Sequence, residues 1–239
     1  MIATVERSHP EEIHPALWRA SQLARGGGKF IDTGYASLSA ELPGGGWPAG
    51  SLIELLPQRT GIGELRLLQP ALGLLGKRPI GLIDPPNTLN GPGLASIGLR
   101  LDAVVQLRAS NMADKLWAAE QVLSAGSFGA LLLWLEQVPQ ASLRRLHLAA
   151  QSSETLFVVT RPEWAATQAS PATIHIGLQP VEEGLAINIL KRRGPAASES
   201  LKVALLPASM LSRNRRTARR APVAIVAQEA EAAIEAEDA

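Results

Sequence analysis

The chain has 239 residues, of which 46% are hydrophobic and 19% are charged, with a net charge of +1 and no cysteine. This composition suffices for one domain of moderate size, and it excludes disulfides, thiolate metal sites and a cysteine nucleophile. The first residues lack an apolar segment next to basic residues, and no apolar run reaches the ~18 residues of a membrane span. We therefore expect no signal peptide, no membrane contact and a cytoplasmic location.

Residues 1–50 are predicted to form a helical lead-in. Apolar residues at helical spacing from Ile13 onward predict a helix over residues 10–25. A second short helix is predicted over Tyr35–Leu42, where Pro43 and three glycines end it. Residues 47–50, with the sequence WPAG, are predicted to be a turn that leads into the first strand of the main domain.

Residues 51–206 are predicted to form the main domain, because apolar strand-like runs alternate with helical segments. The predicted strands are Leu52–Leu56, Pro79–Asp84, Ala103–Leu107, Gly129–Leu135 and Thr155–Thr160. The predicted helices are Leu65–Leu75, Leu94–Leu99, Asp114–Ser124 and Gln140–Ala150. The run Gly129–Leu135 is apolar throughout, which indicates burial on both faces. This alternation is typical of an α/β fold with a mainly parallel sheet flanked by helices.

The pattern changes after Arg161, where no further helix is predicted. Three strands, Thr173–Leu178, Leu185–Leu190 and Leu201–Leu205, follow one another across short turns. Residues 180–184 are predicted to be a hairpin turn between the first two of them. We therefore expect antiparallel strands at one edge of the sheet.

Residues 207–239 are predicted to be a flexible tail that is first basic and then acidic. Its five clustered arginines are candidates for contact with DNA or a partner: Arg213, Arg215, Arg216, Arg219 and Arg220. A transient helix is expected within residues 221–236, and the acidic end, Glu229–Asp238, offers a brake that competes with DNA. The alternative is a tail that is simply solvated.

The turn after the first strand has the layout of a phosphate loop without its chemistry. The template G-x-x-x-x-G-K-[ST], laid on Leu56–Gly63, matches only at Gly61. Ile62 and Gly63 stand where the lysine and the hydroxyl residue are needed, and Glu64 is expected to repel phosphate. The degenerate loop comprises Pro57, Gln58, Arg59, Thr60, Gly61, Ile62 and Gly63. We expect no cofactor, with nucleotide binding without hydrolysis as the alternative, in which Arg59 partly replaces the missing cation.

Several stretches resemble the RecA recombinase family in their order along the chain. They are LPGGGWPAGSLIELL at 42–56, LIDPPNTLN at 82–90, ASIGLRLDAVVQLRAS at 95–110 and INILKRRGPAA at 187–197. Residues 33–56, 117–135 and 184–195 are similar to the ImuA branch of this family, which is grouped with the SulA-like cell-division inhibitors. The resemblance covers about Ala16–Leu205 and implies a RecA-like fold.

The ImuA resemblance implies a non-catalytic adaptor in SOS-induced, error-prone translesion DNA synthesis, located at the nucleoid during DNA damage. Its partners would be a RecA-type recombinase, ImuB, an error-prone C-family DNA polymerase and single-stranded DNA. Two alternatives stay open. One is a SulA-type inhibitor that binds the tubulin-like division protein. The other is a DNA-stimulated ATPase that uses Arg59 and Glu136 in substitute roles.

The resemblance also locates the catalytic positions of RecA-like enzymes, and these do not carry the required groups here. Pro86 stands where a carboxylate would orient the attacking water, and Asp84 is interpreted as a residue that caps a turn. Trp134 stands where a metal-organising carboxylate is expected. We therefore predict no catalytic residue. The histidines lack the spacing of a zinc site, so no metal is expected.

A second basic candidate lies at the end of a predicted strand. Lys191, Arg192 and Arg193 precede a Gly-Pro pair and are candidates for contact with DNA phosphates or with an acidic neighbour. In the resembled family, the positions of Lys191 and Arg193 reach the nucleotide of a neighbouring subunit. The alternative is a solvated basic strand end.

Overall fold

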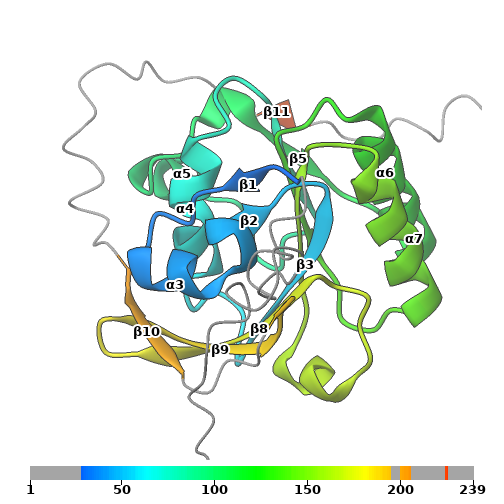
Figure 1. The fold of residues 1–239 in the computed structure, drawn as a ribbon. Helices are drawn as coiled ribbons and strands as arrows, with labels where there is room; N and C mark the ends of the chain where they lie inside the picture. The colour runs from blue at the N-terminus through cyan, green and yellow to red at the C-terminus, as the bar shows by residue number, and fades with distance from the viewer. Residues whose placement is uncertain (1–27, 195–199, 206–223, 226–239) are drawn as a thin grey trace, which may run out of the picture.

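The computed structural model describes residues 28–194, 200–205 and 224–225 (Figure 1). The predicted helix over residues 10–25, the arginines at 213–220 and the acidic end lie outside the described residues. What the structure describes is an α/β fold built on one large sheet, as predicted.

The large sheet has nine strands in the order β10-β9-β8-β3-β7-β6-β4-β5-β11 among the described residues. The parallel strands are β3 (Ser51–Pro57), β4 (Ile80–Ile83), β5 (Val104–Leu107), β6 (Ala130–Trp134), β7 (Leu156–Thr160), β8 (Ile174–Val181) and β11 (Ala224–Ile225). Strands β9 (Gly184–Lys191) and β10 (Leu201–Ala204) are antiparallel. The predicted α/β fold, with a mainly parallel sheet and antiparallel strands at one edge, is confirmed.

Helices cover both faces of this sheet because the parallel strands are apolar on both sides. One face packs against α3 (Ala36–Glu41), α4 (Glu64–Gly73) and α5 (Gly91–Ser96). The other face packs against α6 (Met112–Ala125) and α7 (Gln140–Gln151), which lie side by side on the right of Figure 1. Short 3-10 turns complete the core: η1 (Pro43–Gly45), η2 (Leu101–Ala103) and η3 (Glu163–Thr167).

Most of the predicted helices and strands in the described residues are present as helices and strands, with a few corrections. Trp47–Pro48 is not a turn but strand β2, which pairs with β1 (Phe30–Ile31) in a small antiparallel sheet, so residues 28–50 are not purely helical. The helix predicted at Leu94–Leu99 starts and ends earlier, as α5, because Asn90 caps it. Within the region predicted as a transient helix, Ala224–Ile225 forms a strand.

The tryptophans divide between core and surface. Trp47 is fully buried, as expected of a core anchor, whereas Trp117 and Trp164 are 58% and 47% exposed. Of the helices that the structure describes, none has the length and apolar character needed to cross a membrane.

Candidate functional site

The phosphate-loop turn between β3 and α4 holds an anion that belongs to the chain itself. The carboxylate of Glu64 accepts a hydrogen bond from the backbone N–H of Gly61 (2.9 Å to Oε1) and another from that of Gly63 (3.0 Å to Oε2). Glu64 is 5% exposed, at the first residue of α4. Backbone N–H groups at such a turn are the groups that hold phosphate in a working loop. Glu64 was expected to repel phosphate, and its carboxylate lies where two of these donors converge.

Gly63 shows why the loop does not carry the hydroxyl residue of the template. Its φ is +126°, a conformation that residues with a Cβ rarely adopt. A Cβ placed there would lie 2.6 Å from Cδ1 of Leu205, which follows β10. The guanidinium of Arg66 also donates to the carbonyl oxygen of Leu205 (3.1 Å), so this neighbour is held in place. Serine or threonine at position 63 would therefore be strained and crowded.

We predict that Glu64→Ala lowers the free energy of unfolding by about 1–3 kcal/mol, because two partly buried hydrogen bonds lose their charged acceptor. The same variant should gain weak affinity for inorganic phosphate at the freed N–H groups. Urea unfolding with and without phosphate measures both effects. Glu182→Ala, at an exposed position in the β8–β9 turn, is the matched control and should change neither quantity. Unchanged stability of Glu64→Ala would contradict the inferred role of the carboxylate.

A cleft of about 600 Å³ opens beside this turn, at the carboxyl ends of the parallel strands. We call it the carboxyl-edge cleft. It is lined by Pro57, Gln58, Arg59, Thr60, Asp84, Pro86, Met112, Lys115, Trp134, Leu135, Glu136, Thr160, Arg161 and Pro162. The structure thus brings together around one cavity the residues that were singled out separately: Arg59, Asp84, Pro86, Trp134 and Glu136.

Both carboxylate oxygens of Asp84 contact neighbouring segments of the fold. It is the only described non-glycine residue with positive φ (+45°), directly after β4. Its Oδ1 accepts from the N–H of Ala109 (3.3 Å), and its Oδ2 pairs with Nζ of Lys115 (3.1 Å). These contacts tie the end of β4 to the start of α6 and agree with its interpretation as a capping residue. Glu136, in contrast, is exposed at the cleft.

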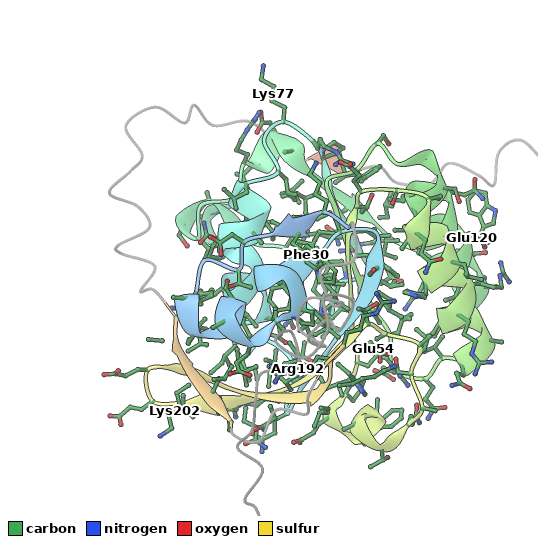
Figure 2. All side chains as sticks on the ribbon, in the orientation of Figure 1. Phe30, Glu54, Lys77, Glu120, Arg192 and Lys202 are labelled. Atoms are coloured by element: carbon green, nitrogen blue, oxygen red, sulfur yellow. The ribbon has the colours of Figure 1, made fainter. Side chains whose placement is uncertain are left out.

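A buried group of charged residues was missed by the sequence reasoning. Glu54 on β3, labelled in Figure 2, pairs with Arg161 after β7. The distance between Oε1 and Nη1 is 3.1 Å, and both side chains are almost fully buried. His175 on β8 lies opposite Glu54 in the sheet, with its Nε2 3.5 Å from Oε2 of Glu54. Arg161 also donates to Gln168 after η3. The group therefore joins three adjacent strands to the segment between β7 and β8.

The basic strand end does not present three equivalent cations. Arg192 is largely buried, and its guanidinium bonds to the carboxylate and carbonyl oxygens of Glu41 on α3. Lys191 donates to the carbonyl oxygen of Ser170 (2.8 Å), and Arg193 is exposed. Arg192 thus holds α3 against the sheet, and Lys191 and Arg193 remain the candidates for contact with DNA or a partner.

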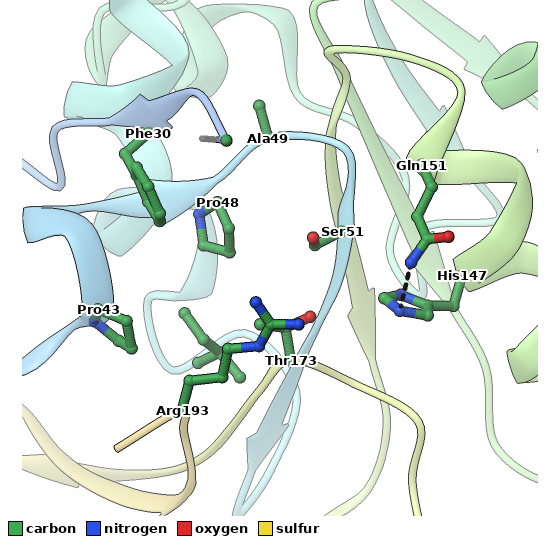
Figure 3. A pocket seen from close by; sticks show the side chains of 11 residues that line it. Phe30, Pro43, Pro48, Ala49, Ser51, His147, Gln151, Thr173 and Arg193 are labelled. Atoms are coloured by element: carbon green, nitrogen blue, oxygen red, sulfur yellow. Dashed lines mark hydrogen bonds between the residues drawn. The ribbon is translucent and has the colours of Figure 1, made fainter. Parts of the chain in front are cut away.

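Arg193 lines a smaller pocket of about 290 Å³ near the amino ends of the parallel strands, between β3, β8 and α7 (Figure 3). On its far wall, Nδ1 of His147 accepts a hydrogen bond from the N–H of Leu52 (3.2 Å). Neutral His147 therefore carries its proton on Nε2. Both His147 and His175 contact neighbouring strands, and among the described residues no three His, Cys, Asp or Glu side chains are grouped as a metal site would need.

We predict that acid destabilises the fold through these two histidines. Burial lowers the pKa of His147, and the charges of Lys191 and Arg193 lower it further. Burial also lowers the pKa of His175, with Arg161 and Lys191 adding to the effect and Glu54 opposing it. The unfolded chain binds protons at these histidines more readily than the folded chain does. The neutral imidazoles therefore contribute fully to the free energy of unfolding above about pH 6.5, and this contribution is lost as the pH falls through the folded pKa values.

Urea unfolding at pH 7.5 and at pH 5.5 measures this loss. His147→Asn keeps an acceptor for the Leu52 N–H but does not titrate, so its loss between the two pH values should be smaller than that of the wild type. An equal loss in both proteins would show that His147 does not contribute to it.

No protein-family model matches the chain, but curated relatives do. The cell division inhibitor SulA of Pectobacterium atrosepticum is 35% identical over 106 residues, which are 43% of this chain and 63% of that protein. SulA of Yersinia enterocolitica is 30% identical over 132 residues, 54% of this chain and 79% of that protein. SulA of Serratia proteamaculans is 29% identical over 137 residues, 56% of this chain and 82% of that protein.

Each match covers only part of this chain and part of the relative. The chain spans about three fifths of the length of several SulA relatives, the Pectobacterium atrosepticum protein among them. In turn, more than two fifths of the chain lies outside each match. The relatives support the SulA-related side of the resemblance, and none of the three bears the ImuA name.

Proposed function

The chain belongs to the family of the SulA cell division inhibitors, and on this premise we propose that it is a non-enzymatic inhibitor of cell division in the SOS response. It would act by binding the tubulin-like division protein rather than by turning over a nucleotide. This is the alternative left open by the sequence, and the names of the relatives favour it over the adaptor.

The observation that supports a non-enzymatic role is the position of the Glu64 carboxylate in the phosphate-loop turn. An ATPase needs a lysine for the terminal phosphates and a hydroxyl for Mg²⁺, and the structure has Ile62 and a crowded Gly63 in those places. The loop N–H groups are engaged by an internal anion, so a nucleotide would have to displace it. A scaffold of this kind supports recognition of a partner through its surface.

Expression of the intact chain in dividing bacterial cells tests the proposal. We expect filamentous cells, and purified protein should lower the amount of sedimentable polymer formed by the tubulin-like division protein. Phosphate release should stay at background with and without single-stranded DNA. Normal cell length at high abundance, together with unchanged polymer, would contradict the proposal. Turnover that Arg59→Ala abolishes would instead support the ATPase alternative.

The ImuA-type adaptor is the second candidate, and a separate observation favours it. Five arginines lie within residues 213–220, a cluster suited to single-stranded DNA or an acidic partner. The adaptor would link a RecA-type recombinase to ImuB and an error-prone C-family DNA polymerase. A deletion strain that loses damage-induced mutation, without any change in division, would favour this candidate. Unchanged recombinase and ImuB pull-down after removal of residues 207–239 would exclude the tail from that role.

A further inference from the structure

The carboxyl-edge cleft is placed where ligands bind in open α/β sheets. After β4 the chain crosses to β5, whereas after β6 it crosses in the opposite direction to β7. Strands β4 and β6 are neighbours, so the two connections diverge and leave a crevice at their carboxyl ends. Asp84 follows β4 and Glu136 follows β6, and both line the cleft. The cavity is thus a product of the topology.

We propose that the acidic end of this same chain, Glu229–Asp238, docks in the carboxyl-edge cleft. The path of the chain leads there. Ala224 and Ile225 form β11, which runs parallel to β5 with Ala224 opposite Val105 and Ile225 opposite Gln106. Because the strands are parallel, the chain leaves Ile225 at the carboxyl edge of the sheet, the edge on which the cleft opens.

The remaining sequence is long enough to reach the cleft. Strands β5 and β4 separate β11 from β6, so the distance across the sheet is roughly 15 Å at ~4.8 Å per strand. An extended chain covers this in about five residues at ~3.3 Å each. Residues 226–239 follow β11, so the carboxylates from Glu229 onward fall within reach.

Charge complementarity selects the acidic end as the occupant. It carries Glu229, Glu231, Glu235, Glu237 and Asp238. On the cleft side, Arg59 lines the cavity and Arg108 follows β5, both exposed and without a described hydrogen bond or ion pair. Lys115 and Arg161 add positive charge, although each faces a carboxylate partner. Glu136 is the one unpaired described carboxylate in the lining.

The cleft also offers apolar contacts. Met112, Trp134 and three prolines contribute to its walls, and Ile234 lies in the middle of the acidic end. A short tether gives an effective concentration in the millimolar range, so a contact that is weak between separate molecules is populated within one chain. A partner that used the same cleft would first have to displace the tail. The carboxyl-edge cleft would then be autoinhibited, and salt would release it.

Hydrogen exchange on the full chain tests the proposal without any partner. The comparison is between the wild type and a full-length variant in which the five carboxylates become Gln or Asn. We expect slower exchange in the wild type at residues 57–62 and 108–116, equal exchange at residues 184–191, and loss of the difference in 0.5 M salt. Equal exchange at all of these segments would overturn the proposal.

A labelled peptide of residues 226–239 supplies the second measurement. It should bind the neutralised-tail variant more tightly than the wild type, whose own tail competes. Adding Arg59→Ser or Arg108→Ser should weaken peptide binding by roughly three- to tenfold. Lys77→Ser, an exposed cation at the top of Figure 2 before β4, is the matched control and should leave it unchanged. If neither arginine change matters, the acidic end binds elsewhere, for example at Arg213–Arg220, and the proposal is wrong.

Discussion

Arg161→Met should lower the free energy of unfolding by about 3–5 kcal/mol, the largest single effect that the structure predicts. The change removes the guanidinium from a carboxylate that is fully buried on β3, and leaves Glu54 with only His175 nearby. It also removes the hydrogen bond to Gln168 that holds the segment after β7. The midpoint of thermal unfolding should fall by roughly 6–20 °C.

The pH dependence of this variant distinguishes a lost ion pair from lost packing. Arg161 lowers the pKa of His175 while Glu54 raises it, so removing Arg161 should raise that pKa. The imidazolium then pairs with Glu54, and the destabilisation should be smaller at pH 5.5 than at pH 8. Replacing both partners, as Arg161→Met with Glu54→Leu, should restore much of the stability, because no buried charge is left alone.

Arg145→Met is the control for Arg161→Met. Arg145 forms an ion pair with Glu120 between α7 and α6, but its side chain is 66% exposed. Such surface pairs contribute less than about 1 kcal/mol. If Arg161→Met were no more costly than Arg145→Met, the buried group would have no special part in holding β3, β7 and β8 together.

Gly63→Ser, which restores one residue of the phosphate-loop template, should destabilise the chain by about 2–4 kcal/mol. A residue with a Cβ at φ +126° costs of order 1–3 kcal/mol. Crowding against Leu205 adds about 1 kcal/mol, because the end of that flexible side chain must move. Denaturant unfolding measures the loss, and we expect no gain of ATP binding because Glu64 still engages the loop N–H groups.

Gly61→Ser separates the two contributions. Gly61 also has positive φ (+85°), but a Cβ there would meet nothing closer than the Asn87 amide at 3.9 Å. It should therefore show the conformational cost without the crowding. Leu205→Ala added to Gly63→Ser should recover part of the loss. An equal cost at positions 61 and 63 would contradict the inferred role of Leu205.

The architecture was predictable because the strands of this chain are simple to recognise. Gly129–Leu135 and Thr155–Thr160 are continuous apolar runs, and burial on both faces of a parallel sheet requires that pattern. Two-residue strands such as β1 and β2 give no periodicity, so Trp47–Pro48 was mistaken for a turn. The boundaries of α5 depend on Asn90 as a cap, which the apolar pattern does not register.

The sequence alone shows which template residues the candidate site lacks, but it does not predict which residues contact one another there. Ile62, Gly63 and Pro86 follow from comparison with a template. That Glu64 would bind its own loop depends on the turn geometry, which no residue pattern specifies. One feature of the sequence points to the group of Glu54, Arg161 and His175. Each residue lies in or directly after an apolar strand, where a charge needs a buried partner. The partners are 107 positions apart, so only the fold identifies them.

The Glu64 carboxylate and the crowded Gly63 also bear on which functions this chain can acquire by mutation. A nucleotide site would require a lysine at position 62, a hydroxyl at position 63, the loss of Glu64 and at least one new catalytic carboxylate. Taken singly, the changes at positions 63 and 64 are predicted to weaken the fold while returning no activity. Marginal stability leaves little room for such intermediates. Variants of this chain are therefore expected to diversify their binding surfaces and not to acquire ATP chemistry.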